Sequence, residues 1–354
     1  MKKSLMAVAL LGGFAGVAQA QTAVQIYGTI DAGLVKRTDQ TLAIGKRAAN
    51  TLGFKGTEDL GNGLKALFQI EMRYEPDTGT VENNGRPLFQ GQSRVGLQGD
   101  FGMVRIGRGL TPMQETIGAY DPWHALPTPA GFYTDLTVAG YTSAPLDPSG
   151  ASNNRWQNGF WYNTQPNLWG GFQINAAVAT KEATGNQTAI VGNGTPTAPQ
   201  YPVNSEASAN PFSVSATYNN GPAAAMIAYE RNAVETKFWA IGGAFNVTPE
   251  LKLMATYSRQ DRGHTLAFNP DTKAWVLGGQ YSVGPGKFLF GYGQKHPDNA
   301  AKTKQFSLGY EYSLSKRTYL YVDASRKQDI TTAAGLLANP STVNHYDVGL
   351  NHSF

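Results

Sequence analysis

Few residues of this chain are spaced in a way that could support catalysis or metal binding. Glu58 and Asp59 are adjacent, but acid–base catalysis needs an opposing partner and a substrate pocket, so capping of a turn is the simpler interpretation. There is no cysteine and no Gly-x-Ser-x-Gly motif, which excludes thiolate zinc sites, cysteine nucleophiles and a serine-hydrolase elbow. The histidines lack the spacing of metal ligands: His124, His264, His296, His345 and His352. The sequence therefore predicts no enzyme, no metal site and no cofactor.

The composition fits a protein rich in strands and tight turns. Charged residues are 15% of the 354, against about 25% in an ordinary soluble domain, and glycine occurs 41 times. The mean hydropathy of −0.33 and the lack of a long apolar run in the body of the chain argue against a helical membrane protein. The net charge of +4 is small and dispersed, so no nucleic-acid partner is expected.

Residues 1–20 have the three parts of a secretory leader. Two lysines form a basic start, an apolar stretch follows from Leu5 to Val17, and Ala18-Gln19-Ala20 is a small-residue cleavage site. The apolar stretch is shorter than the roughly 20 residues that a membrane-spanning helix requires. We therefore expect export and cleavage after Ala20, which leaves 27 basic and 25 acidic residues in the mature chain.

Apolar and polar residues alternate along most of the body of the chain. Between Leu64 and Tyr74, and again between Phe306 and Leu314, apolar or aromatic side chains recur at every second residue. This period of two marks a strand with one apolar and one polar face. The pattern recurs in about sixteen segments before the end of the chain.

Alternating strands also occur in a soluble β-sandwich, because its inner face is buried and its outer face is wet. Three features favour a transmembrane barrel instead. The strands are about 9–12 residues long, the length of a tilted bilayer span. Tyrosines recur near strand ends, where amphipathic rings suit the membrane–water boundary. Short turns, such as that at Asn220-Gly221, alternate with long polar stretches, such as 181–210, as in outer-membrane barrels.

The expected fold is therefore all-β: a 16-stranded antiparallel transmembrane β-barrel that forms a single domain over residues 21–354. Lipid cannot hydrogen-bond to a free strand edge, so every strand must pair on both sides and the sheet must close. At roughly 16–18 strands a barrel is too wide for its side chains to fill. A water-filled channel is the expected consequence.

Several motifs occur in an order that resembles a known family. They are VQIYGTIDAGL at 24–34, LGFKGTEDLGNGLKA at 52–66, VGLQGDFGMVRIGR at 95–108, the stretches 155–162 and 166–172, and LSKRT at 314–318. Together these motifs resemble the Gram-negative trimeric porins, the general diffusion channels, in their β-proteobacterial branch. The similarity covers essentially the whole mature chain.

The resemblance implies a homotrimer of sixteen-stranded barrels, each with a pore narrowed by an inward-folded constriction loop 3. This loop corresponds to about residues 110–141, a stretch rich in proline, glycine and aromatic residues. The terminal Phe354 resembles the signal that the outer-membrane assembly machinery reads. We accordingly expect a Gram-negative outer-membrane protein whose partners are that machinery, outer-membrane lipid and lipopolysaccharide.

The family places acidic residues on the third loop opposite basic residues on the wall, and such facing charges set ion selectivity. The matching positions are Arg155, Arg108 and Arg94 on the basic side, and Glu115, Asp121 and Asp135 on the acidic side. Lys46 or Arg47 could add to the basic side from the first loop. Many relatives carry arginine where this chain has Thr51 and Gly91, which thins the basic cluster and leaves the preference between cations and anions open.

The expected function is passive diffusion of ions and small hydrophilic solutes through a water-filled channel. Two alternatives remain. A substrate-selective channel, for a sugar or an anion, would line its pore with a ladder of aromatic or charged side chains. A barrel enzyme would need a Ser–His pair on the outward face, and the sequence offers no motif for one.

Overall fold

The computed structural model describes residues 23–82, 87–137, 155–180, 209–232, 236–261, 271–331 and 336–354. The predicted leader, residues 1–20, lies outside these ranges, as does the end of the predicted third loop, residues 138–141. No helix among the described residues is both long and apolar enough to cross a membrane.

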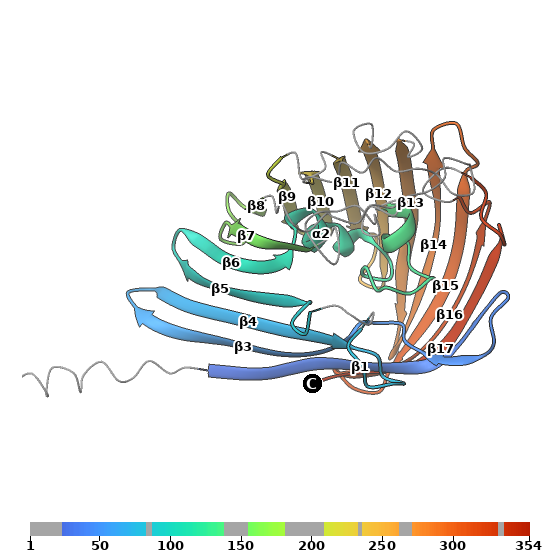
Figure 1. Cartoon of the computed structure of the whole chain (residues 1–354), viewed down its shortest axis with the longest axis horizontal. Coiled ribbons are helices and arrows are strands. Elements are labelled where there is room, and N and C mark those ends of the chain that lie inside the picture. The colour runs from blue at the N-terminus through green and yellow to red at the C-terminus, as the bar shows by residue number, and fades with distance from the viewer. Residues whose placement is uncertain are drawn as a thin grey trace, which may run out of the picture.

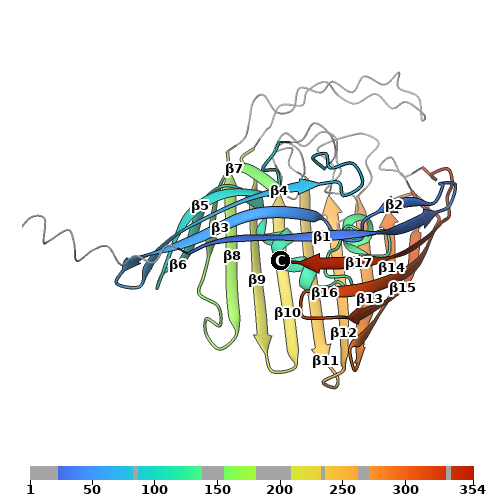
Figure 2. The ribbon, with the colours of Figure 1, turned by 90° about the horizontal axis from the view of Figure 1, so that it is seen from below.

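Sixteen long strands form one antiparallel sheet that closes on itself (Figure 1, Figure 2). β1 pairs with β3 through residues 23–29 and with β17 through residues 29–37, so the first and last strands join the two ends of the sheet. A short additional strand, β2 (Ala43–Gly45), pairs with β1. The predicted sixteen-stranded barrel is confirmed. The long strands are β1 (Ala23–Arg37), β3 (Asn50–Gly61), β4 (Leu64–Tyr74), β5 (Gln92–Gly99), β6 (Gly102–Leu110), β7 (Arg155–Asn163), β8 (Phe172–Ala179), β9 (Phe212–Asn220), β10 (Ala223–Arg231), β11 (Lys237–Asn246), β12 (Leu251–Asp261), β13 (Thr272–Val283), β14 (Gly286–Pro297), β15 (Thr303–Ser313), β16 (Thr318–Gln328) and β17 (Val343–Ser353).

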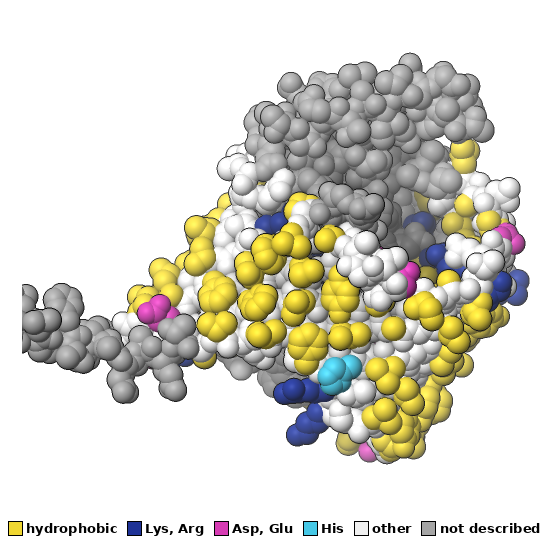
Figure 3. Space-filling view, turned by 60° about the horizontal axis from the view of Figure 1, so that its bottom comes forward, with side chains coloured by type: hydrophobic (Ala, Val, Ile, Leu, Met, Phe, Trp, Pro, Cys, Tyr) yellow, Lys and Arg dark blue, Asp and Glu magenta, His cyan; other side chains and the backbone are white. Residues whose placement is uncertain are grey.

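The two faces of the sheet differ as the alternation predicts. Ile227 and Leu277 are 60% and 56% exposed, whereas their neighbours Met226 and Val276 are 5% and 2% exposed. Apolar side chains gather on the outer surface, and charged side chains are sparse among them (Figure 3). An apolar outer face suits hydrocarbon, and the opposite face lines the interior of the barrel.

Tight turns join the strands at one end of the barrel. β9 and β10 are joined at Asn220-Gly221, where Gly221 has a φ of +57°, a left-handed conformation that glycine adopts without steric cost. At another turn, Oδ1 of Asp59 accepts a hydrogen bond from the N–H of Gly61 at 2.8 Å, as expected for a capping carboxylate. The connections at the other end, such as that between β16 and β17, are longer.

The connection between β6 and β7 contains three short helical elements, within residues 111–137, which we call the loop segment. They are α2 (Pro112–Ile117), the 3₁₀ helix η1 (Gly118–Tyr120) and the π-helix η2 (Tyr133–Thr137). Proline at the first helical position suits α2, because the N–H that proline lacks has no partner there in any case.

The loop segment packs on the face of the sheet opposite the exposed apolar side chains. α2 contacts β8, β9 and β10, and η2 contacts β12, β13 and β14 (Figure 1). Met113 and Ile117 are fully buried in a cluster with Met226 and Phe238. A second cluster brings Trp123, Phe132 and Leu136 against Val276 and Leu289. Apolar burial therefore fixes the position of the loop segment at both ends.

Candidate functional site

Polar side chains of the barrel wall hold the middle of the loop segment. Nε2 of Gln280 on β13 donates to the carbonyl oxygen of Pro122 at 2.6 Å. Nε2 of Gln305 on β15 lies 3.0 Å from the carbonyl oxygens of both Pro129 and Gly131. These carbonyl groups lie in irregular backbone, so the wall amides supply hydrogen bonds that a helix or strand would otherwise provide.

A cavity of about 700 Å³ lies between the loop segment and the facing strands. The facing side includes residues of β1, β3, β4, β7, β16 and β17. Its lining combines charged and polar side chains with apolar ones such as Leu110 and Leu126. The charged and polar lining residues are Thr29, Thr51, Arg73, Gln114, Glu115, His124, Tyr133, Arg155, Tyr319, Asn351 and Ser353.

Two of the predicted basic residues are held by the backbone that leads into β5. Nε of Arg155 donates to the carbonyl oxygen of Gly91 at 2.9 Å, and Nε of Arg108 donates to that of Gln90 at 3.1 Å. Both side chains are largely buried, and Arg155 lines the cavity. A Cβ at Gly91 would lie 2.3 Å from the carboxylate of Glu71. Glycine at this position therefore lets the backbone approach Glu71 closely while its carbonyl group accepts from Arg155.

Glu115 and Arg94 are brought into direct contact. Oε1 of Glu115 lies 3.2 Å from Nη1 of Arg94, and its Oε2 lies 3.6 Å from Nη2 of Arg105. Glu115 is thus shared by two arginines of the adjacent wall. Opposite charges at contact distance largely cancel each other at longer range. An ion some distance away is therefore little affected by the negative charge of Glu115.

Sequence reasoning missed Arg105, although its alternation with the exposed Ile106 places it on the inner face of β6. In a regular strand, residues 105 and 108 would point to opposite faces. Gly107 has a φ of +127°, and the pairing of β6 with β7 shifts register between Gly107 and Gly109. Both side chains are nevertheless buried, and this irregularity lies between them. The only local sequence signal of this irregularity is the pair of glycines that flank Arg108, Gly107 and Gly109.

Arg73 is a second lining residue that sequence reasoning missed. It lies on β4, and its Nη1 is 3.7 Å from Oε2 of Glu82. The available signal was its parity, because Arg73 alternates with Met72 and Tyr74 and so belongs to the polar face of the strand.

Of the other two predicted acids, Asp121 does not join this group. Asp121 is 2% exposed, and its Oδ2 accepts a hydrogen bond from the N–H of Ala125 at 2.9 Å, within the loop segment itself. It is not among the residues that line the cavity. The side chain of Asp135 lies outside the described residues.

Protonation of Asp121 should tighten the loop segment as the pH falls. Burial raises the pKa of Asp121 to about 6, from about 3.9 in an unfolded chain. Protonated Asp121 therefore stabilises the folded protein fully at pH values below the pKa of the unfolded chain. This stabilisation is lost as the pH rises through the pKa of the folded protein, and it amounts to at most about 3 kcal/mol. Amides of residues 123–132, corrected for intrinsic rates, should exchange more slowly at pH 5 than at pH 7. Asp121→Asn should abolish this difference in exchange rate between pH 5 and pH 7. If the difference persisted in the variant, another titrating group would be its cause.

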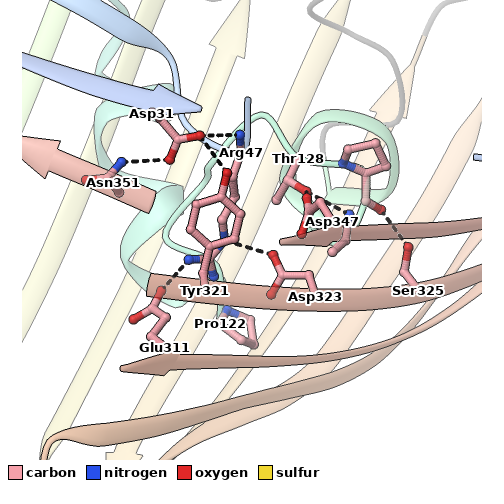
Figure 4. A network of polar contacts seen from close by, with 12 residues as sticks. Asp31, Arg47, Pro122, Thr128, Glu311, Tyr321, Asp323, Ser325, Asp347 and Asn351 are labelled. Carbon is pink, nitrogen blue, oxygen red and sulfur yellow. Dashed lines mark hydrogen bonds and ion pairs between the residues drawn. The ribbon is translucent and has the colours of Figure 1, made fainter. Parts of the chain in front are cut away.

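A buried ionic network anchors the first loop to the C-terminal strands (Figure 4). The Arg47 side chain is fully buried, with Nη1 2.7 Å from Oε1 of Glu311 and Nε 2.8 Å from Oδ2 of Asp323. The backbone N–H of Arg47 donates to Oδ1 of Asp31 on β1 at 2.6 Å, and Oη of Tyr321 donates to the same atom at 2.8 Å. Arg47 is therefore an internal ion-pair partner. Lys46 lies 2.9 Å from Glu75 and 2.6 Å from Glu82, so it too is paired with acids.

Comparisons with known proteins agree on one family. The family model described as Gram-negative porin matches residues 7–330. An outer membrane porin protein of Bordetella pertussis is 28% identical over the whole of both chains. The anion-selective porin from Comamonas acidovorans has a similar structure, with a TM-score of 0.74 and 25% identity over 94% of this chain and 100% of that one. OmpT of Vibrio cholerae, in a trimer form, shares the fold with a TM-score of 0.64 and 14% identity over 94% of this chain and 99% of that one.

Proposed function

Because this chain belongs to the Gram-negative porin family, we propose that it is an outer-membrane porin, a water-filled channel for passive diffusion of ions and small hydrophilic solutes. The observation that carries the proposal is the cavity of about 700 Å³, whose lining includes charged and polar side chains, inside a closed sheet whose outer face is apolar. Such a wall separates a wet interior from lipid. Transport of this kind needs no covalent step, energy source or cofactor.

In this proposal the loop segment narrows the channel, and the cavity beside it sets the size limit. Arg155 faces the cavity with Arg73, which lies 3.7 Å from Glu82, and with Glu115, whose charge is offset by Arg94 and Arg105. A solute in the cavity then meets an excess of positive charge, which favours anions. The anion selectivity of the Comamonas relative supports this preference.

Three copies are proposed to assemble in the outer membrane, as the family resemblance implies. Phe354 is the proposed signal for the assembly machinery. Its N–H donates to the carbonyl oxygen of Gly28 on β1 at 3.1 Å, and the N–H of Gly28 donates back to Phe354 at 3.1 Å. The end of the chain thus completes the closing pair of strands, a place where a recognition signal could be read before closure.

Planar bilayers test the proposal. Purified protein should give large, ohmic conductance steps, in groups of three if three pores insert together, and the reversal potential in a salt gradient should have the sign of anion preference. Liposomes that contain the protein should swell in sugars up to a size limit. A small conductance that one sugar blocks would instead favour a substrate-selective channel, and the absence of any conductance would refute both.

Loss of the Gln305 amide should widen or destabilise the channel. Gln305→Leu removes the donor shared by the carbonyl groups of Pro129 and Gly131, and an unsatisfied buried carbonyl costs about 1–3 kcal/mol. The loop segment should then leave the wall, with a higher or noisier single-channel conductance and a larger sugar limit in liposome swelling. Gln294→Leu, on the outer face of β14, is the matched control and should conduct as the unmodified protein does. Equal conductance in both variants would show that Gln305 does not position the segment.

A further inference from the structure

The barrel wall that faces the loop segment is interrupted beside β1. Residues 30–32 of β1 lie between the part of the strand that pairs with β2 and the part that pairs with β3. These three residues face five, 46–50, so the neighbouring chain carries two residues more than a regular ladder needs. Extra residues of this kind form a β-bulge, which bends the strand and redirects its side chains. We call residues 46–49 the wall bulge.

The side chain of Asn50 bridges the interruption. The N–H of Asp31 donates to Oδ1 of Asn50, and Nδ2 of Asn50 donates to the carbonyl oxygen of Asp31 at 3.1 Å. One side-chain amide therefore serves both backbone groups of Asp31, as a paired strand would. Asp31 and Asn50 are fully buried, where an unpaired backbone group would be costly. The ladder thus passes the wall bulge without leaving these groups unpaired.

The carboxylate of Asp31 holds the backbone of the wall bulge (Figure 4). Its Oδ1 accepts a hydrogen bond from the N–H of Arg47 at 2.6 Å, and its Oδ2 accepts one from Nδ2 of Asn351 at 2.8 Å. Hydrogen bonds to a charged acceptor are stronger than those between neutral groups. Asp31 therefore ties the wall bulge to β17.

The two cationic side chains of the wall bulge are fixed at different places. Lys46 is paired with two glutamates of the β4–β5 connection, whereas Arg47 is paired with acids of β15 and β16. The guanidinium carbon of Arg47 also lies 4.9 Å from the centre of the Tyr321 ring. A buried ion pair often contributes no more stability than apolar side chains of the same volume would. Stability alone therefore does not explain this network, whereas fixing the position of the wall bulge does.

The wall bulge places Ala48 and Ala49 against the cavity of about 700 Å³. From the other side, the loop segment lines the same cavity with residues that include Gln114, Gly118 and Ala119. Ala48 is buried and Ala49 is half-buried, so a larger side chain at Ala49 would extend into the cavity. The free width between the wall bulge and the loop segment thus depends on two small side chains.

We propose that the wall bulge is the second side of the narrowest passage in the pore, facing the loop segment, and that Ala48 and Ala49 set the size of the solutes that pass. Asp31 and Asn50 are positioning residues, because they hold the wall bulge and do not themselves line the cavity. The proposal rests on the proposed function, since it treats the cavity as the path of hydrated ions and small hydrophilic solutes. The side chains that the wall bulge presents to the cavity are uncharged, so it acts on size.

The test uses a single thiol, because the chain contains no cysteine before Ala49→Cys is introduced. The probes are two methanethiosulfonate reagents, one that adds a sulfonate and one that adds a trimethylammonium group, and mass spectrometry confirms the modification. Both products should lower the conductance in planar bilayers and the sugar limit in liposome swelling, because both narrow the passage. A unit charge about 8 Å from an ion in water changes the local ion concentration about twofold, so the two products should differ about fivefold in local anion concentration, which the reversal potential reports.

Ala225→Cys is the matched control for the added thiol. Ala225 lies on the outer face of β10, two residues from the exposed Ile227. Modification of this variant adds the same group outside the pore, so the conductance and the reversal potential should not change.

A second substitution tests whether Asn50 positions the wall bulge. Asn50→Leu in the Ala49→Cys background removes the amide that pairs with Asp31, so the conductance lost on modification should become smaller. Asn175→Leu removes another buried asparagine amide, which donates to Ser215 at 3.2 Å and does not line the cavity, and the loss should persist in that background. If Asn50 only stabilised the fold, Asn50→Leu would leave the effect of modification unchanged.

Two results would overturn the assignment: an Ala49→Cys thiol that neither reagent reaches, or a modified protein that conducts as it did before. Either result, beside normal conductance of the unmodified protein, would refute the role of the wall bulge and leave the channel standing. An unmodified protein that never conducts would instead refute the proposed function, and this inference with it.

Discussion

Arg155→Glu is expected to shift the reversal potential of the channel strongly toward cations. Arg155 lines the cavity, and its replacement changes the local charge by two units. A unit charge about 8 Å from an ion in water changes its energy by about 0.5 kcal/mol, so the reversal amounts to about 1 kcal/mol, or about fivefold in local ion concentration. The substitution lowers the local concentration of anions and raises that of cations. The ratio of their permeabilities therefore changes by more than either concentration alone.

The measurement is the reversal potential in a salt gradient at low ionic strength, where screening extends beyond about 10 Å. Lys316→Glu, in the exposed turn between β15 and β16, makes the same charge change far from the cavity and should leave the potential unaltered. Arg73→Glu should act in the same direction as Arg155→Glu, since Arg73 also lines the cavity. If neither arginine variant moved the potential, the narrowest part of the pathway would lie elsewhere.

Arg47→Met is expected to cause the largest loss of stability. The guanidinium group is fully buried between Glu311 and Asp323, and its removal leaves Asp323 without that neutralising charge in the interior. Breaking a buried ion pair by removing one partner costs about 3–5 kcal/mol. The urea midpoint of the refolded protein in detergent should fall accordingly, without a change in the slope of the transition.

A second substitution separates the loss of charge from the loss of packing. Asp323→Asn in the Arg47→Met background removes the uncompensated acid, so the double variant should recover part of the stability, and the cycle gives the interaction energy. Lys46→Met, which breaks partly exposed ion pairs one residue away, should have a smaller effect. An Arg47→Met protein as stable as the Lys46→Met protein would mean that water or a counter-ion reaches the network.

The barrel could be predicted from the sequence because its determinants are local. Alternation between Leu64 and Tyr74 depends only on which face of one strand meets lipid, and a turn such as Asn220-Gly221 needs only a left-handed glycine. Once the strands were counted, closure followed from the need to pair every backbone group. The structure confirms each of these steps.

The candidate site was less predictable, because it depends on register and on contacts between distant segments. The register shift beside Gly107 lies between Arg105 and Arg108, which are both buried, and alternation alone cannot reveal such an irregularity. The contact between Arg94 and Glu115 depends on how α2 packs against strands far along the chain. Arg47 could be noted as a loop cation, but its acidic partners on β15 and β16 lie more than 260 positions away, so no local pattern shows that it is internal.

The pairing of β1 with β17 has a consequence for biogenesis. The first strand to emerge during export has one edge, along residues 29–37, that stays unpaired until the last strand arrives, and contacts of such long sequence separation form slowly. For that whole interval the chain crosses the periplasm with aggregation-prone β edges, which binding by holdase chaperones would keep from aggregating. A chain that lacks its final strand would leave two strand edges unpaired, on β1 and on β16, and should be a substrate for proteolysis. Closure of the barrel thus depends on complete synthesis of the chain.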